Sequence, residues 1–362
     1  MKLIRHLLDK VRPNFETERK LHLLRPLFHA IDNFLLSPAT ATAAAPFIRD
    51  PLDVKRFMSA VILALMPSVL ASLYFFGLRV IAMIAVSYAV GGTIEVLIAI
   101  ARKEEINEGF LVTGLIFPLV LPPSLPMWMV AVGIAFGVIV GKELFGGTGR
   151  NLFNPALVGR CFLAIGYPVA MSSQWIKPGA GLVGRLTQYV TSSNVDAVSK
   201  ATPLVSAKQG TYAPVIHLLL GNVSGSVGET SALAVLAGGI FLLAAKVANW
   251  RTVAGTVGTF LVLGVILHQL HPGRFGPVGW HLLAGGLLFG AFFMATDPIT
   301  SPLTNSGKWL YGGLIGTATL LIRNLTGYVE GIMFAILLGN IVAPLLDEAA
   351  VRFRLGRLRG ER

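Results

Sequence analysis

Long apolar stretches separated by short polar segments make up most of the chain after residue 56. A helix of about 20 apolar residues is long enough to span a bilayer, and several of these stretches reach that length. Ten such stretches are found, at 57–76, 79–101, 109–121, 126–141, 151–168, 230–248, 251–270, 279–296, 309–323 and 329–346. The pattern therefore predicts an all-α membrane protein with about ten transmembrane helices.

Two Pro-rich interruptions lie in matching places, LPPSLP at 121–126 and DPITSP at 297–302. A similar segment precedes each one, GLIFP at 114–118 and GLLFG at 286–290. Irregular backbone at membrane depth is tolerated only inside protein or beside a cavity, so we expect broken helices here. The match predicts two five-helix repeats, and because five is odd, the second repeat runs inverted in the membrane.

The chain accordingly divides into two membrane repeats with three polar segments. These are a polar N-terminal segment (1–56), the first repeat (57–168), a large loop (169–229), the second repeat (230–346) and a basic tail (347–362).

The distribution of charge predicts the orientation. Hydrophobic residues make up 54% of the chain and charged residues only 13%, while the net charge is +12. With both termini placed in the cytoplasm, 22 of the 30 Lys and Arg residues fall on the cytoplasmic side, as the positive-inside rule requires. The large loop is then external, and the basic surplus faces lipid head groups or partner subunits, so nucleic acid is not needed to explain it.

The sequence gives little indication of a metal site or of a disulfide bond. Cys161 is the only cysteine, which excludes an internal disulfide and any iron–sulfur cluster bound by this chain alone. The histidines show no metal-binding spacing.

Acidic residues at membrane depth or at its edge are candidates for an ion path, above all Glu95, Asp297 and Asp347. An intramembrane charge costs about 2.5–3.5 kcal/mol on insertion scales, so it usually has a partner or a function. The alternative for Glu95 is a structural carboxylate satisfied by backbone N–H groups or by Arg160. The alternative for the two aspartates is capping at helix ends.

Two glycine-containing motifs are candidates for holding a ring. Gly91 and Gly92 allow close approach of a ligand, or simply of a neighbouring helix. Gly147 and Asn151 belong to a turn that we expect to open a helix, where backbone N–H groups favour anions and polar ring edges, and Asn154 follows it. The alternative is a tight cytoplasmic turn.

Thr202 stands in the large loop within the segment DAVSKATPL, 196–204. Taken alone, the segment is compatible with a surface turn, because a threonine without a base is a poor nucleophile.

The segment at 196–202 resembles the flavinylation site of a family of membrane proteins that includes the B subunit of the sodium-pumping NADH:quinone reductase and the D subunit of the Rnf complex. The resemblance extends from about residue 23 to residue 347, through RDPLDVKR (49–56), NEGFLVT (107–113), GKELFGGTGRN (141–151), NPAL (154–157), GSVGETS (225–231), FMATDP (293–298) and APLLD (343–347). This chain has Lys200 where the family usually has glycine.

The resemblance implies an inner-membrane electron-transfer subunit with a fold similar to urea channels. It implies that a flavin transferase attaches FMN to Thr202 through a phosphoester, within a motif that includes Asp196, Ser199 and Ala201. It further implies non-covalent riboflavin, ubiquinone near Gly91 and Gly92, and Na⁺ uptake that involves the three acids Glu95, Asp297 and Asp347. The implied partners are an NADH-oxidising flavin and iron–sulfur subunit and a second FMN-bearing subunit.

Two other functions remain open at this point. Inverted repeats with broken helices also suit a flavin-free channel or secondary transporter. The Rnf member of the family, which would carry electrons between ferredoxin and NAD, resembles the same motifs.

Overall fold

Helices are the only regular elements in the described part of the chain, which comprises residues 54–103, 109–172, 175, 178, 202–328 and 330–360 of a computed structural model. The prediction of an all-α protein is therefore confirmed. In chain order the elements are α3 (Val54–Phe76), α4 (Arg79–Arg102), α5 (Gly109–Leu119), α6 (Met127–Gly141), the 3₁₀ turn η3 (Glu143–Phe145), α7 (Pro155–Gly166), α8 (Pro168–Ser172), α10 (Pro203–Lys208), α11 (Val215–Leu220), α12 (Ala232–Ala244), α13 (Trp250–Leu270), α14 (Val278–Leu283), α15 (Leu287–Phe289), the π-helical turn η6 (Gly290–Met294), α16 (Asn305–Leu325) and α17 (Ile332–Gly360).

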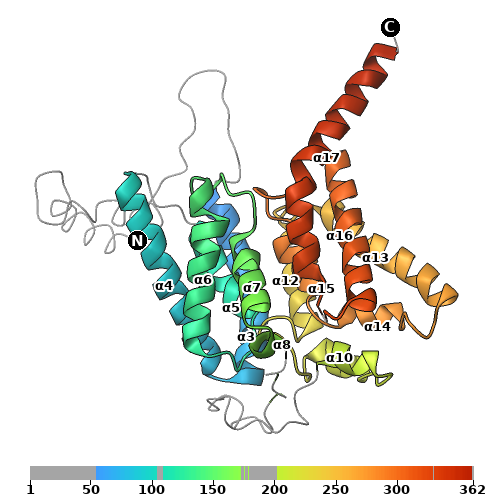
Figure 1. Cartoon of the computed structure of the whole chain (residues 1–362), viewed down its shortest axis with the longest axis horizontal. Coiled ribbons are helices and arrows are strands. Elements are labelled where there is room, and N and C mark those ends of the chain that lie inside the picture. The colour runs from blue at the N-terminus through green and yellow to red at the C-terminus, as the bar shows by residue number, and fades with distance from the viewer. Residues whose placement is uncertain are drawn as a thin grey trace, which may run out of the picture.

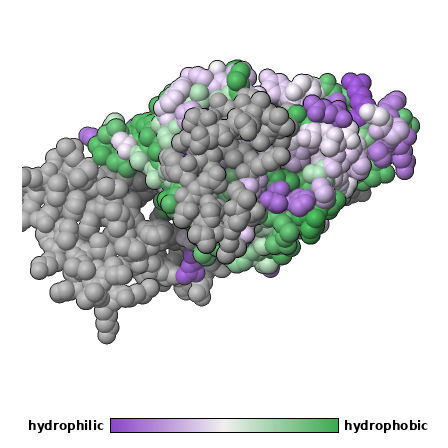
Figure 2. Space-filling view, turned by 90° about the horizontal axis from the view of Figure 1, so that it is seen from below, coloured by the Kyte–Doolittle hydropathy of each residue, from purple (hydrophilic) through white to green (hydrophobic). Residues whose placement is uncertain are grey.

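Among the described residues, five helices are long and apolar enough to cross a membrane. They cover Arg56–Phe76, Arg79–Arg102, Met127–Phe145, Trp250–Leu270 and Ile332–Gly356. Large apolar side chains such as Leu63, Leu97 and Val262 are exposed on them, and apolar surface is extensive in Figure 2. Lipid accepts such a surface whereas water does not, so this is a multi-pass membrane protein.

The two halves of the chain pack their helices in the same order. In the first half α4 packs against α6 and α6 against α7, and in the second half α13 packs against α16 and α16 against α17 (Figure 1). Contacts between α3 and α12 join the halves. This correspondence agrees with an internal repeat, while its inverted orientation stays a prediction.

Glycines bring the main helix pairs into backbone contact. A Cβ atom added at Gly137 of α6 would overlap the Pro155 carbonyl oxygen of α7. One added at Gly316 of α16 would overlap the Thr256 carbonyl oxygen of α13. Close packing of small residues is a main source of helix association in lipid, where the hydrophobic effect between helices is absent.

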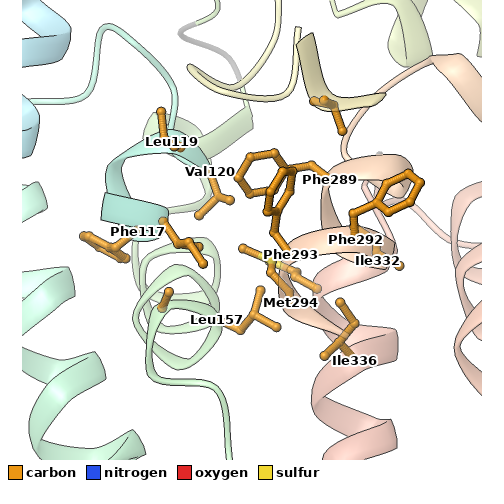
Figure 3. Packing of buried hydrophobic residues seen from close by; sticks show 14 of the residues in the cluster. Phe117, Leu119, Val120, Leu157, Phe289, Phe292, Phe293, Met294, Ile332 and Ile336 are labelled. Atoms are coloured by element: carbon orange, nitrogen blue, oxygen red, sulfur yellow. The ribbon is translucent and has the colours of Figure 1, made fainter. Parts of the chain in front are cut away.

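Short helical segments meet at the centre of the molecule. Val120, directly after α5, lies on the side facing Phe289 of the α15–η6 segment in Figure 3, and both residues belong to the buried core. The apolar stretch at 279–296 is divided into α14, α15 and η6, because α14 ends at Leu283 and the chain turns at Gly285, where φ is +70°. Only glycine adopts this backbone conformation without strain, so the helix is interrupted here.

Two boundaries differ from the sequence prediction. The helix expected from Asn151 begins at Pro155, because the Asn154 side chain accepts hydrogen bonds from the backbone N–H groups of Ala156 and Leu157 at 3.1 and 3.4 Å. An asparagine N-cap followed by proline is a strong helix start. The large loop is also partly ordered into helices, since α8, α10 and α11 lie in or at the edge of it.

Candidate functional site

Two cavities are lined by four of the nine described candidate residues, Thr202 in one and Asn151, Asn154 and Asp297 in the other. The Thr202 cavity has a volume of about 370 Å³ and lies among α7, α8, α10 and the segments before α12 and α17. The Asp297 cavity has a volume of about 70 Å³ and is lined by Lys142, Asn151, Asn154 and Asp297. They lie toward opposite ends of the helix bundle, with α10 at the end away from the C-terminus of α17 (Figure 1).

Thr202 is the N-cap residue of α10 and lines the first cavity. Its hydroxyl oxygen accepts a hydrogen bond from the Val205 N–H at 3.4 Å, and Pro203 occupies the first helical position. The residue is only 7% exposed and lines the Thr202 cavity. The structure therefore places Thr202 in the lining of a cavity rather than on an exposed turn.

Two buried ion pairs lie at the Thr202 cavity, which Arg160, Glu229 and Glu330 line. Arg160 of α7 donates to Glu229 at 2.9 Å, and both side chains are 4% exposed. Arg323 of α16 donates to Glu330 at 2.8 Å, and Glu330 also accepts from the Gly286 N–H at 2.9 Å. Two cations and two carboxylates balance, as burial in a low dielectric requires.

Lys208 connects the C-terminal end of α10 to the segment after α16. Its ammonium group donates to the carbonyl oxygens of Thr326 and Tyr328 at 2.9 and 3.0 Å. Partial burial lowers the pKa of the Lys208 ammonium group from its ordinary value, because desolvation disfavours the charged form. The short helix that carries Thr202 is thus connected at its C-terminal end to the segment after α16.

Three members of the predicted flavinylation motif, Asp196, Ser199 and Ala201, lie outside the described residues. Their predicted roles stay predictions.

Two asparagines, Asn151 and Asn154, line the Asp297 cavity, and their side chains form hydrogen bonds with the backbone. Asn151 donates to the Phe153 carbonyl oxygen at 3.0 Å, and Asn154 caps α7. The buried Asn340 of α17 accepts from the Asn154 N–H at 3.3 Å and donates to the Tyr311 hydroxyl at 2.9 Å. These contacts give Asn151 and Asn154 structural roles, as the turn interpretation predicts, and they add Asn340, which the sequence analysis missed.

Glu95 pairs with Lys142 rather than with Arg160. The Lys142 Nζ atom lies 2.5 Å from Glu95 Oε1, and the side chains are 3% and 7% exposed, respectively. Arg102 of the same helix donates to Glu143 at 3.2 Å, next to this pair. The alternative of Arg160 as partner was wrong because Arg160 lies by the other cavity, bound to Glu229.

The two aspartates accept hydrogen bonds near the start of α16. Asp297 accepts from the Ile299 N–H at 3.2 Å and from the Thr300 hydroxyl at 3.0 Å. Asp347 accepts from the Leu303 N–H at 2.7 Å and from both the N–H and the hydroxyl of Thr304, at 2.9 and 2.6 Å. Asp347 thus joins α17 to the segment before α16, and because α17 continues to Gly360, Asp347 lies inside the helix rather than at the helix end that the capping alternative expected.

The candidate glycines Gly91, Gly92 and Gly147 make contacts that belong to helix packing and to a turn. A Cβ atom at Gly91 would lie 2.7 Å from the Phe110 ring, and one at Gly92 would lie 3.2 Å from the same ring. Both glycines therefore meet α5 in helix packing. Gly147 lies in the turn after η3 with φ of +84°, and its N–H donates to the Lys142 carbonyl oxygen at 3.2 Å.

The sequence analysis did not assign several of these residues to a site, namely Lys142 and the Glu229, Arg323 and Glu330 ion-pair members. An Arg or Lys inside or at the end of an apolar stretch is the signal that predicts a buried carboxylate partner, but it does not say which one. In the described part of the chain no group of three His, Cys, Asp or Glu residues is arranged to hold a metal ion.

Known proteins match this chain over almost its whole length. The family described as NQR2, RnfD, RnfE matches residues 41–356. The chain is similar to the B subunit of the Na(+)-translocating NADH-quinone reductase of Ectopseudomonas mendocina. The two are 37% identical over an alignment of 410 positions, which covers 98% of each chain. Proteins of the same name from Azotobacter vinelandii and Klebsiella pneumoniae are 38% and 37% identical, also over 98% of each chain.

Proposed function

Because the chain belongs to the NQR2, RnfD, RnfE family, we propose that it is the membrane electron-transfer subunit of a sodium-pumping NADH:quinone reductase. The proposal has four parts. Thr202 carries FMN through a phosphoester bond, electrons pass from it through riboflavin to ubiquinone, and Na⁺ is exported as they do so. NADH is oxidised on a partner subunit, because one cysteine does not hold an iron–sulfur cluster by itself.

The observation that carries the proposal is that Thr202 lines the Thr202 cavity. Its volume of about 370 Å³ falls within the roughly 300–1,000 Å³ of typical ligand pockets. Trp175 and Tyr328 offer aromatic surface to a flat ring, while Ser226 and Glu330 line the cavity with polar groups. A flavin bound here supplies one- and two-electron chemistry, and the residues of this chain position it and exclude water.

Riboflavin and quinone are assigned with less support from the geometry. The Asp297 cavity, at about 70 Å³, is far smaller than a typical ligand pocket, so a ring held by Gly147, Asn151 and Asn154 requires the lining to open. Replacing Asn151 by Ala tests this part. Flavin content and quinone affinity are expected to fall, and the assignment fails if both are retained.

Na⁺ is proposed to pass along Glu95, Asp297 and Asp347. Glu95 supports this part best, because it is buried at one end of α4 and belongs to the same group of contacts as Lys142 and the Asp297 cavity. Oxygen ligands of this kind suit hard cations.

The proposed setting is the bacterial inner membrane, with both termini cytoplasmic and Thr202 on the outer side. There an exported flavin transferase has access to it. The two halves are proposed to be inverted five-helix repeats, similar to urea channels, and their equal packing order supports this arrangement. The proposed partners are an NADH-oxidising flavin and iron–sulfur subunit, a second FMN-bearing subunit and membrane lipid.

The test is in-gel flavin fluorescence of the denatured protein from cells that contain a flavin transferase. The unmodified sequence is expected to fluoresce and Thr202→Val to be dark. Thr202→Asn is the sharper variant, because asparagine keeps an acceptor for the Val205 N–H and removes the hydroxyl. Thr211→Val, which alters an exposed threonine nearby, is expected to stay fluorescent.

A dark band from the unmodified sequence would refute the FMN assignment and favour a flavin-free channel or transporter. An RnfD-type protein is the second candidate, because the matched family includes RnfD. Identifying the neighbouring subunits in a purified complex separates the two electron-transfer assemblies.

A further inference from the structure

We propose that the Lys142 ammonium group occupies the place of a monovalent cation at Glu95, so that Na⁺ binds there only by displacing it. The inference rests on the proposed function, since it names what controls cation occupancy on the proposed Na⁺ path.

The contact itself is that of a buried, compensated charge pair. Lys142 Nζ lies 2.5 Å from Glu95 Oε1, with side-chain exposures of 3% and 7%. Lys142 follows α6 directly, and Glu95 lies in the last third of α4, so the pair joins two helices at one end of the bundle. A carboxylate buried this deeply needs one positive charge, and the ammonium group supplies it.

The second oxygen of Glu95 leaves room for another ligand. Glu95 Oε2 is buried and has no hydrogen-bond partner among the described residues. Buried carboxylate oxygens are usually satisfied, so an open one points to a group that binds part of the time. A hard cation that takes oxygen ligands meets this requirement.

Lys142 also borders the Asp297 cavity, which gives the displaced ammonium group a place to go. Both Lys142 and Asp297 line this cavity of about 70 Å³. The space exceeds the roughly 10–15 Å³ that one water needs, and the flexible four-carbon stem of lysine can turn within it. Asp297 there offers a second carboxylate, so the ammonium group exchanges one negative partner for another.

The net charge at Glu95 explains why Lys142 and Na⁺ compete for it. Glu95 with either Lys142 or Na⁺ is neutral, whereas Glu95 with both carries one net positive charge in a low dielectric. The two cations therefore exclude each other. If the ammonium group occupies Glu95 nine-tenths of the time, the apparent Na⁺ affinity is weakened about tenfold, because only the free fraction binds.

The experiment measures Na⁺-dependent quinone reduction by the purified complex at alkaline pH, where protons compete least for Glu95. Lys142→Met keeps the length of the stem and removes the charge. We expect its half-saturating Na⁺ concentration to fall about tenfold. The matched control is Lys246→Met, which removes an exposed lysine just after α12, and its Na⁺ dependence is expected to be unchanged.

The outcomes separate the two claims. A Na⁺-dependent unmodified complex whose Lys142→Met variant retains the same half-saturation overturns the exchange at Lys142. An unmodified complex without any Na⁺ dependence overturns the proposed Na⁺ transport instead.

A second measurement needs no variant and covers the case in which Lys142→Met fails to assemble. Reductive methylation of the unmodified complex, followed by peptide mass spectrometry, reports how accessible Lys142 is. Na⁺ is expected to raise methylation of Lys142 above that in choline at equal ionic strength and to leave Lys208 unchanged. Equal methylation of Lys142 in both salts contradicts the inference.

Discussion

The Arg160–Glu229 ion pair provides a quantitative test of how the Thr202 cavity is built. Arg160→Met removes the cation and leaves Glu229 with its other described neighbours only, in a site where both side chains are 4% exposed. Arg160 also donates to the Ser226 hydroxyl at 3.4 Å, so the substitution frees a second polar group. The substitution is therefore expected to destabilise the protein mainly because it leaves the buried Glu229 charge uncompensated, and less because it removes a contact.

Removing one partner of a buried pair typically costs about 3–5 kcal/mol, whereas replacing both with apolar residues is often close to neutral. We expect Arg160→Met to lower the free energy of unfolding by about 3–5 kcal/mol. The double variant Arg160→Met/Glu229→Met is expected to recover much of this loss. Coupling between contacting residues reaches about 3 kcal/mol, and this pair should lie near that upper end.

Equilibrium unfolding in mixed detergent–SDS micelles measures these differences for the single and double variants. Arg352→Met is the control, because Arg352 pairs with Glu348 in the open, where the side chains are 79% and 60% exposed. Exposed pairs contribute about 0–1 kcal/mol, so this variant should unfold almost as the unmodified protein does. Additive losses for Arg160 and Glu229, without recovery in the double variant, would refute the reasoning.

Two further stability predictions use the same unfolding assay. Gly316→Ala is expected to lose about 1–3 kcal/mol, because its Cβ would overlap the Thr256 carbonyl oxygen, while Gly258→Ala, with nothing within 4 Å, should cause no loss; equal effects would contradict the packing argument. Asn340→Leu is expected to lose about 1–3 kcal/mol, because it leaves the Asn154 N–H without its acceptor, and an unchanged stability would show that this link is dispensable.

The helices were predictable from the sequence because their signals are local. The apolar stretch at 79–101 became α4 (Arg79–Arg102) almost residue for residue, since its length and hydrophobicity depend on no other segment. The boundary at Pro155 was missed although its Asn-Pro signal was present, because the hydrophobic pattern alone does not distinguish a turn from a helix start. The break at Gly285 depends on a positive φ, which a glycine permits but does not require.

Partners of buried charges were not predictable because they are chosen by three-dimensional packing. Arg160 lies 69 residues from Glu229 along the chain, and Lys142 lies 47 residues from Glu95. The sequence indicated that each charge needs a partner but offered several acids for each cation. Thr202 was the reverse case, because its motif singled it out while only the structure placed it beside a cavity.

The most direct test of the account is the mass of the tryptic peptide 201–208, which contains Thr202, from protein made in cells with a flavin transferase. The account predicts that this peptide carries FMN less one water and that fragmentation places the group on Thr202 rather than on Ser206. An unmodified peptide, or a flavin on any other residue, would contradict it.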